Sequence, residues 1–202
     1  MRTEKFKESK MLKKLLTCLA LCVFVCMSIT EHAYAYIPLG VTGYGLYGNY
    51  ETQEKSNWCW VACAKNINHW TGTSFRTQSL AVKEVKGSVS NVTGNIYETQ
   101  QAAEYISNHS VSYTWNNNVL SYFGICDRIF NDQPVIAGGL KFLPTGFAPH
   151  MVLFVAWYNG NGNNRLTFFD PETGFYEDCI YEDLLESYSP SGFMYWESVY
   201  MI

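Results

Sequence analysis

Residues 53–70 read Q-E-K-S-N-W-C-W-V-A-C-A-K-N-I-N-H-W, and this stretch organises the rest of the chain. Apolar residues recur at steps of three and four between Cys59 and Trp70, which predicts a helix buried on at least one face. Gly72 marks the end of that helix, because glycine readily adopts the left-handed conformation that follows a last helical turn. The stretch therefore predicts a buried helix that begins close to a cysteine.

The residues around Cys59 suggest a nucleophilic thiol. Ser56 and Asn57 precede it as candidate N-caps, so Cys59 is expected in the first helical turn. A helix N-terminus favours the thiolate by about 0.3–1 kcal/mol, and up to about 2 kcal/mol when it is partly buried. Gln53 lies six residues before Cys59, within reach of an oxyanion hole in which its amide joins the backbone N–H of Cys59.

The first 35 residues are predicted to be a secretory signal peptide. Five lysines precede the apolar run Leu15 to Ile29, and the segment ends in Ala33-Tyr34-Ala35, a small-residue cleavage site. An uncleaved membrane anchor is the alternative, but the run of about 15 apolar residues is shorter than the roughly 20 that a spanning helix needs. We therefore expect cleavage after Ala35 and a protein located outside the cell or in the cell envelope.

Composition and charge limit the partners of the remaining chain. The protein has 202 residues, 48% of them hydrophobic, which suits one globular domain. Six of the 14 Lys and Arg residues and three of the 18 Asp and Glu residues precede residue 36, so the remainder carries a formal charge of −7. An acidic domain is a poor match for phosphate backbones, and nucleic acid is not expected as a partner. We expect a monomer without stable membrane association.

Four cysteines follow the predicted signal peptide: Cys59, Cys63, Cys126 and Cys179. One helical turn separates Cys59 from Cys63, which places their Cβ atoms roughly 5–6 Å apart, farther than a disulfide prefers. We expect buried free thiols, with a Cys126–Cys179 bridge left open as the alternative. No spacing of Cys and His residues resembles a zinc site, so we expect neither a metal nor another cofactor.

Periodicity along the chain predicts an α+β fold. Residues 36–51 are rich in glycine and tyrosine and are expected to form an extended N-terminal arm or a short pro-segment, followed by one domain at residues 52–202. Further helices are predicted at about 77–86, 96–107 and 119–130, and a short one at 181–186. Strands are predicted at 110–115, 135–140, 151–158, 166–169 and 193–201, with turns at 159–164 and 170–174. Helices followed by antiparallel strands are typical of the α+β class.

One histidine is well placed to activate Cys59. His69 lies ten residues along the same helix, roughly 15 Å away, and His109 follows a predicted helix end where it is expected to be exposed. His150 opens a buried strand, which can hold an imidazole rigidly beside a thiol. Asp170 ends the following strand, across a hairpin, and can accept the imidazole N–H and fix its tautomer. The alternative for Asp170 is an Asp-Pro turn that caps its own backbone.

The order of these residues resembles that of the papain-like cysteine peptidases. The segment Q-x5-C-W, Gln53 to Trp60, is similar to the family's oxyanion glutamine, nucleophile and following tryptophan, and His150 and Asp170 follow in the family's order. The segments P-H-M-V-L-F-V and F-F-D-P-E-T-G are most similar to those of small bacterial members, the bacteriocin-processing peptidases and secreted effector peptidases. The C-G-S-C-W form of plant and lysosomal papains is absent.

The resemblance implies a two-lobed fold that hydrolyses peptide bonds. Cys59 would lie on a helix in one lobe and His150 and Asp170 on the antiparallel sheet of the other, with a protein or peptide substrate between the lobes. The neighbours of the nucleophile, Trp60, Asn57 and Trp58, are expected to contact substrate. Two alternatives remain: an amidase or transglutaminase-type acyl transferase on the same fold, and a catalytically inactive peptide-binding protein with an aromatic cleft.

Overall fold

The computed structural model describes residues 49–160, 162–186 and 193–202. The predicted signal peptide lies outside these residues, as do residues 36–48 of the predicted arm or pro-segment. The described helices are α2 (Cys59–Trp70), α3 (Gln78–Lys86), α4 (Ile96–Ile106), α5 (Tyr122–Phe130) and the short 3-10 helix η1 (Glu182–Leu185). The strands are β1 (Tyr113–Asn116), β2 (Val135–Leu143), β3 (Gly146–Gly160), β4 (Asn163–Asp170), β5 (Phe175–Ile180) and β6 (Phe193–Met201).

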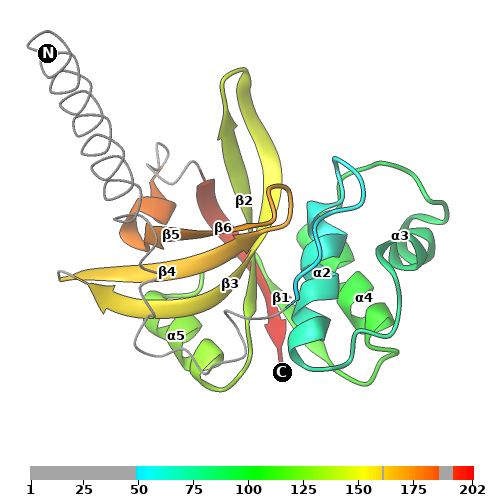
Figure 1. The fold of residues 1–202 in the computed structure, drawn as a ribbon, viewed down its shortest axis with the longest axis horizontal. Coiled ribbons are helices and arrows are strands. Elements are labelled where there is room, and N and C mark those ends of the chain that lie inside the picture. Colours follow the sequence, from blue (N-terminus) through cyan, green and yellow to red (C-terminus); the bar gives the residue numbers. More distant parts are fainter. Residues whose placement is uncertain (1–48, 161, 187–192) are drawn as a thin grey trace, which may run out of the picture. The chain divides into compact units, whose positions relative to one another are not determined.

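The six strands form one antiparallel sheet in the order β1-β6-β2-β3-β4-β5. Helices α2, α3 and α4 gather on one side of this sheet, whereas α5 lies apart from them, below β3 and β4 (Figure 1). The fold is therefore α+β, as the sequence predicts, and its separate helical and sheet parts are consistent with a papain-like fold.

Alternation along the central strands explains how the sheet is held between two cores. On β3, Leu153 and Val155 belong to the core shared with α2 and α4, while Val152 and Phe154 belong to the core beneath α5. Successive side chains of a strand point to opposite faces, so the continuous apolar run of β3 serves both cores. The long strand that carries His150 is therefore fixed from both faces.

Local sequence signals define the shorter helices. Thr77 caps α3 by accepting a hydrogen bond from the N–H of Leu80, and Gly87 ends this helix at a φ of 74°. Asn95 and Glu98 form a reciprocal capping box at the start of α4. The positions of these two helices agree with the prediction to within one or two residues.

The sheet is larger than predicted. The sequence pattern does not predict strand β5. Strand β2 continues to Leu143 and β3 begins at Gly146, so that the two form a long hairpin beyond the central sheet (Figure 1). Most side chains of β5 are partly or fully exposed, because this strand is an edge of the sheet. An exposed edge strand lacks the apolar alternation from which strands are predicted.

The described cysteines, Cys59, Cys63, Cys126 and Cys179, are all free and buried. This confirms the expectation of unpaired thiols and excludes the alternative Cys126–Cys179 bridge in this structure. Burial raises the pKa of Cys63 well above its ordinary value, with smaller contributions from Cys59 and Asp170. Within the described ranges, no helix combines the length and apolar character needed to cross a membrane.

Candidate active site

Cys59 is the first residue of α2, as the sequence predicts, but the helix is not capped as expected. Trp58 occupies the N-cap position, and no side chain there accepts a hydrogen bond from the first turn. Ser56 and Asn57 therefore do not cap α2. The Cys59 side chain is 7% exposed, so the thiol lies at the surface of the core and at an uncapped helix N-terminus.

Ser56 and Asn57 instead hold a loop that is distant in sequence. The backbone N–H and side-chain amide of Asn57 donate to the side-chain oxygen and the carbonyl of Asn91, both at 3.0 Å. The Asn91 amide donates in turn to the Ser56 hydroxyl at 3.0 Å. These bonds link the segment before the nucleophile to the loop between α3 and α4.

His150 lies on β3 with only 7% of its surface exposed. Its Nε2 is 2.8 Å from Oδ1 of Asp170, and its ring interacts with the Cys59 side chain. Since Asp170 occupies Nε2, Nδ1 is the nitrogen that remains for the thiol. The structure therefore brings together the helix-borne cysteine and the strand-borne histidine that the sequence singles out.

Asp170, 2% exposed at the end of β4, accepts hydrogen bonds from two neighbouring strands and from its own turn. Oδ1 accepts from His150 and from the backbone N–H of Glu172, each at 2.8 Å. Oδ2 accepts from the ammonium group of Lys141 on β2 at 2.9 Å. The same carboxylate therefore contacts the imidazole and stabilises its own Asp-Pro turn.

These contacts stabilise a charged imidazole. Burial lowers the pKa of His150, but the hydrogen bond to Asp170 and the interaction with Cys59 outweigh it and raise that pKa to about 9. Burial also acts to raise the pKa of Asp170, yet the bonds from His150 and Lys141 and the backbone N–H of Glu172 hold it well below the ordinary value. At neutral pH the pair is therefore an imidazolium beside a carboxylate.

Lys141 also lies beside the one group of candidate metal ligands found among the described residues. Ligand atoms of His150, Asp170 and Glu172 lie within 4.8 Å of one another. The Lys141 ammonium lies 2.9 Å from Asp170 and 2.6 Å from Glu172, so both carboxylates already have a cationic partner. This donor set suits a charge network and does not fit a divalent cation.

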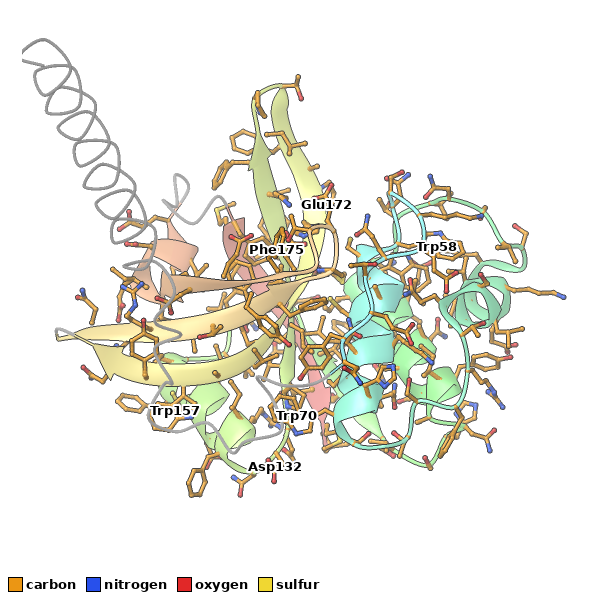
Figure 2. All side chains as sticks on the ribbon, viewed as in Figure 1. Trp58, Trp70, Asp132, Trp157, Glu172 and Phe175 are labelled. Carbon is orange, nitrogen blue, oxygen red and sulfur yellow. The ribbon has the colours of Figure 1, made fainter. Side chains whose placement is uncertain are left out.

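Gln53 lies in the loop that leads into α2, beside the turn between β4 and β5. Its backbone N–H donates to the carbonyl of Pro171 at 2.8 Å, and its side-chain amide donates to the carbonyl of Ser56 at 2.9 Å. A primary amide carries two N–H groups, so one remains for another acceptor. Figure 2 shows Glu172 in the turn that Gln53 contacts and Phe175 at the start of β5 beside it, on the side of the sheet that faces α2.

The aromatic neighbours of the nucleophile are not in contact with the cleft. Trp58 and Trp60 both expose 0% of their surface. Their indole N–H groups donate to the carbonyls of Ser90 and Val92, at 2.9 and 3.2 Å. Trp58, labelled in Figure 2, lies within the helical part of the fold. This differs from the sequence-based expectation for the two tryptophans, because fully buried rings have no surface to offer a substrate. The rings instead hydrogen-bond to the loop after α3, and Asn57 contacts that same loop.

A cavity of about 430 Å³ opens above Cys59 and His150. The helical part contributes Lys86, Thr93, Gly94, Asn95 and Glu98 to its lining, and the sheet contributes Gly139, Pro149, Met151, Trp196 and Glu197. The cavity is thus bounded by both parts of the fold, with the thiol on one wall and the imidazole on the other. An extended peptide can reach both groups from this space.

Sequence reasoning missed Lys141, Trp196 and Glu197. A lysine in a strand reads as a solvent-facing residue, and nothing in the pattern around Lys141 indicates a partner 29 residues away. Trp196 and Glu197 reach the cavity because the pairing of β6 with β2 is irregular, which no local pattern predicts. The only available signal was the pair Gly138-Gly139 in a predicted strand, since glycine inside a strand often marks a bulge.

Comparison with known proteins gives one family match. The model of a family described as papain-like cysteine protease AvrRpt2 matches residues 41–191, which is more than half of the 202-residue chain. The matched range includes Gln53, Cys59, His150 and Asp170. A search of curated proteins finds no match.

Proposed function

Because the chain belongs to the papain-like cysteine protease AvrRpt2 family and is a cysteine peptidase, we propose that Cys59, His150 and Asp170 form its catalytic triad. The observation that supports this most directly is the chain of contacts from the thiol through the buried imidazole to the carboxylate. No sequence pattern imposes that chain of contacts. It arises when a helix and two strands from different parts of the chain pack together.

In the resting enzyme, His150 takes the proton of Cys59 at Nδ1. The pKa of His150, raised to about 9, favours an imidazolium, and the uncapped N-terminus of α2 favours the thiolate beside it. The thiolate is the nucleophilic form, whereas an unperturbed thiol holds only a few per cent of it at pH 7. The ion pair thus supplies the nucleophile without an external base.

The thiolate attacks the peptide carbonyl, forming a carbon–sulfur bond and moving the carbonyl π electrons onto oxygen. The backbone N–H of Cys59 and the second N–H of the Gln53 amide stabilise this oxyanion in our proposal. Collapse of the tetrahedral species breaks the carbon–nitrogen bond, and His150 gives its proton to the leaving amine. Water then attacks the thioester, with neutral His150 as the base, and releases the acid and the thiol.

Asp170 and Lys141 prepare the imidazole for these steps. Asp170 accepts the N–H at Nε2, which directs Nδ1 to the sulfur and stabilises the charged ring. Lys141 and the Glu172 N–H hold the carboxylate in place. We assign Asp170 and Lys141 positioning roles, because they act on the substrate only through His150.

The test is a comparison of the protein with Cys59→Ala and Cys63→Ala variants on a mixed peptide library. We expect the wild type and Cys63→Ala to cleave peptides and Cys59→Ala to cleave none. Iodoacetamide should alkylate Cys59 far faster at pH 6 than it alkylates an ordinary thiol, because the His150 ring beside it is an imidazolium at that pH. Absence of cleavage, together with a rate of Cys59 alkylation that collapses at pH 6, would indicate a catalytically inactive binding protein.

We further propose that the peptidase acts outside the cell or in the cell envelope. This rests on the lysine-rich start, the apolar run and the Ala33-Tyr34-Ala35 site of the sequence. N-terminal sequencing of the protein recovered from culture medium and from cells checks it. A new N-terminus at Tyr36 is expected in the medium, and a chain retained intact inside the cell would exclude secretion by this route.

A further inference from the structure

An irregularity in the sheet brings two side chains to the cavity. Gly138 of β2 pairs with Glu197 of β6, but Gly139 pairs with Tyr195, so Trp196 is an extra residue without a partner on β2. Such a bulge changes the direction in which the neighbouring side chains point. Trp196 is half-exposed, and both it and Glu197 line the cavity that holds Cys59 and His150.

The bulge depends on two adjacent glycines. A Cβ atom on Gly139 would lie 1.7 Å from the carbonyl oxygen of Met194, so no side chain fits there. A Cβ atom on Gly138 would lie 2.6 Å from Cγ and Oε1 of Glu197, which shows that this acidic side chain lies directly over the glycine. Gly139 is also the cross-strand partner of His150. The bulge is therefore built into the wall next to the imidazole.

The other charges of the cavity already have partners. The ammonium of Lys86 is 2.5 Å from the Glu98 carboxylate, which also accepts the N–H of Asn95 in the capping box. His150 is bonded to Asp170, which does not line the cavity. Among the described residues, Glu197 has no ion pair, so it is the cavity's remaining negative charge.

The surroundings of Glu197 favour a cation. Burial raises the pKa of Glu197, and a hydrogen bond with Trp196 only partly opposes this. A carboxylate that is partly removed from water without a counter-charge is costly, and a cation bound beside it relieves that cost. The exposed indole of Trp196 offers the face over which ammonium and guanidinium groups bind best.

We propose that Glu197 and Trp196 form a specificity subsite that binds a Lys or Arg side chain of the substrate close to the scissile bond. The inference rests on the proposed function, because only the nearby thiol makes this cavity a cleavage site. The carboxylate pairs with the cationic group and the indole packs on its aliphatic stem and charged end. The substrate class is therefore peptides and proteins with a basic residue next to the cleaved bond.

The first test uses pairs of peptides that differ only by arginine or the neutral isostere citrulline, placed in turn at each position near the cleavage site. We expect the wild type to prefer arginine at one position by about tenfold to a hundredfold in kcat/KM, the range for a hydrogen-bonded charge. Glu197→Gln should lower kcat/KM for the arginine peptide by that same factor and so remove the preference. Glu197→Lys should favour a glutamate peptide.

Glu84→Gln is the matched control, since it removes the same charge from an exposed position of α3 outside this cavity. It should retain the arginine preference. Equal cleavage of the two peptides by the wild type, or an undiminished preference in Glu197→Gln, would overturn the subsite.

A binding measurement separates the subsite from the chemistry. Calorimetry on Cys59→Ala gives Kd values for the same peptides without turnover, and tighter binding of the arginine peptide is expected. If this difference exists but the wild type cleaves neither peptide, the proposed function fails and the subsite stands. If both peptides bind equally and the wild type cleaves both, the subsite fails and the proposed function stands.

Discussion

Replacement of Asp170 by asparagine should lower the pKa of His150 while leaving the fold intact. Asparagine has the same size, and its Oδ1 can still accept hydrogen bonds from the His150 ring and from the Glu172 N–H, both at 2.8 Å in the wild type. The variant loses the negative charge that faces the imidazolium and that pairs with Lys141 at 2.9 Å. It therefore changes the electrostatics of the site more than its geometry.

The structure gives the size of the effect. The pKa of His150 rises from 6.5 to about 9, a difference of about 2.5, which corresponds to about 3 kcal/mol at 1.36 kcal/mol for each unit. Burial acts in the opposite direction, so the combined attraction of Asp170 and Cys59 is larger than this. Since one opposite charge usually shifts a pKa by about 1–3, we expect Asp170→Asn to lower that of His150 by about 1–2.

The sign of the pH dependence follows from the raised value. The imidazolium exists below pH about 9 and is lost as the pH rises through that value, so the alkaline limb of kcat/KM should lie near pH 9 in the wild type. His150 contributes its full stabilisation of the fold below pH 6.5, and this contribution disappears between pH 6.5 and about 9. In Asp170→Asn, the alkaline limb should move toward neutral pH.

Two measurements check this prediction: NMR titration of the His150 ring with labelled histidine, and the pH profile of kcat/KM. Asp178→Asn is the control, because it removes an equivalent charge from a partly exposed ion pair with Arg165. That variant should leave both measurements unchanged. If His150 titrates at the same pH in Asp170→Asn and in the wild type, the electrostatic account of the triad is wrong.

Three further predictions concern other parts of the site. Gln53→Ala should lower kcat by about 10² to 10³ with little change in KM, as for the loss of one oxyanion donor; an equal change in KM alone would refute that role. Gly139→Ala should lower the unfolding free energy by several kcal/mol, because its Cβ would lie 1.7 Å from a strand carbonyl oxygen. The control Gly124→Ala in α5 should change the unfolding free energy by less than about 1 kcal/mol. Similar melting temperatures for the two variants would contradict this prediction. Lys141→Met should lower the free energy of unfolding by about 1–3 kcal/mol at pH 7, and by less below about pH 4, because the lowered pKa of Asp170 contributes stability only at higher pH. Denaturant titrations at both pH values measure the difference. A loss of stability that does not depend on pH would exclude the ion pair as its source.

The sequence predicted the features that depend on local periodicity. The helices lie within a few residues of their predicted ranges, the central strands contain theirs, and His150 and Asp170 lie together because a hairpin joins their strands. Strand β5 could not be recognised, because an exposed edge strand has no regular apolar pattern. Ser56 and Asn57 do not cap α2 because Trp58 occupies the N-cap position, and both residues instead bond to Asn91, more than thirty residues away.

Side-chain direction was the main limit at the site. Trp60 follows Cys59 directly, but each helical residue is rotated by about 100° from the one before, so adjacency to the nucleophile does not imply contact with the same ligand. Lys141 and Glu197 became visible only with the pairing of β2, β3 and β6. Contacts of this kind depend on register across the sheet, which a single sequence does not determine.

The burial of α2 has a consequence for how this enzyme can change. Ten of its twelve residues are buried, and they include two asparagines and a lysine with hydrogen-bond partners of their own. A helix packed on nearly all sides is held in one position, so residues that do not contact the substrate fix the position of the Cys59 sulfur. A substitution at Ile67, two helical turns from the thiol, can lower kcat without changing any residue that contacts the substrate. Changes in substrate specificity are instead expected at the cavity lining, where loops and the bulged strand β6 tolerate substitution.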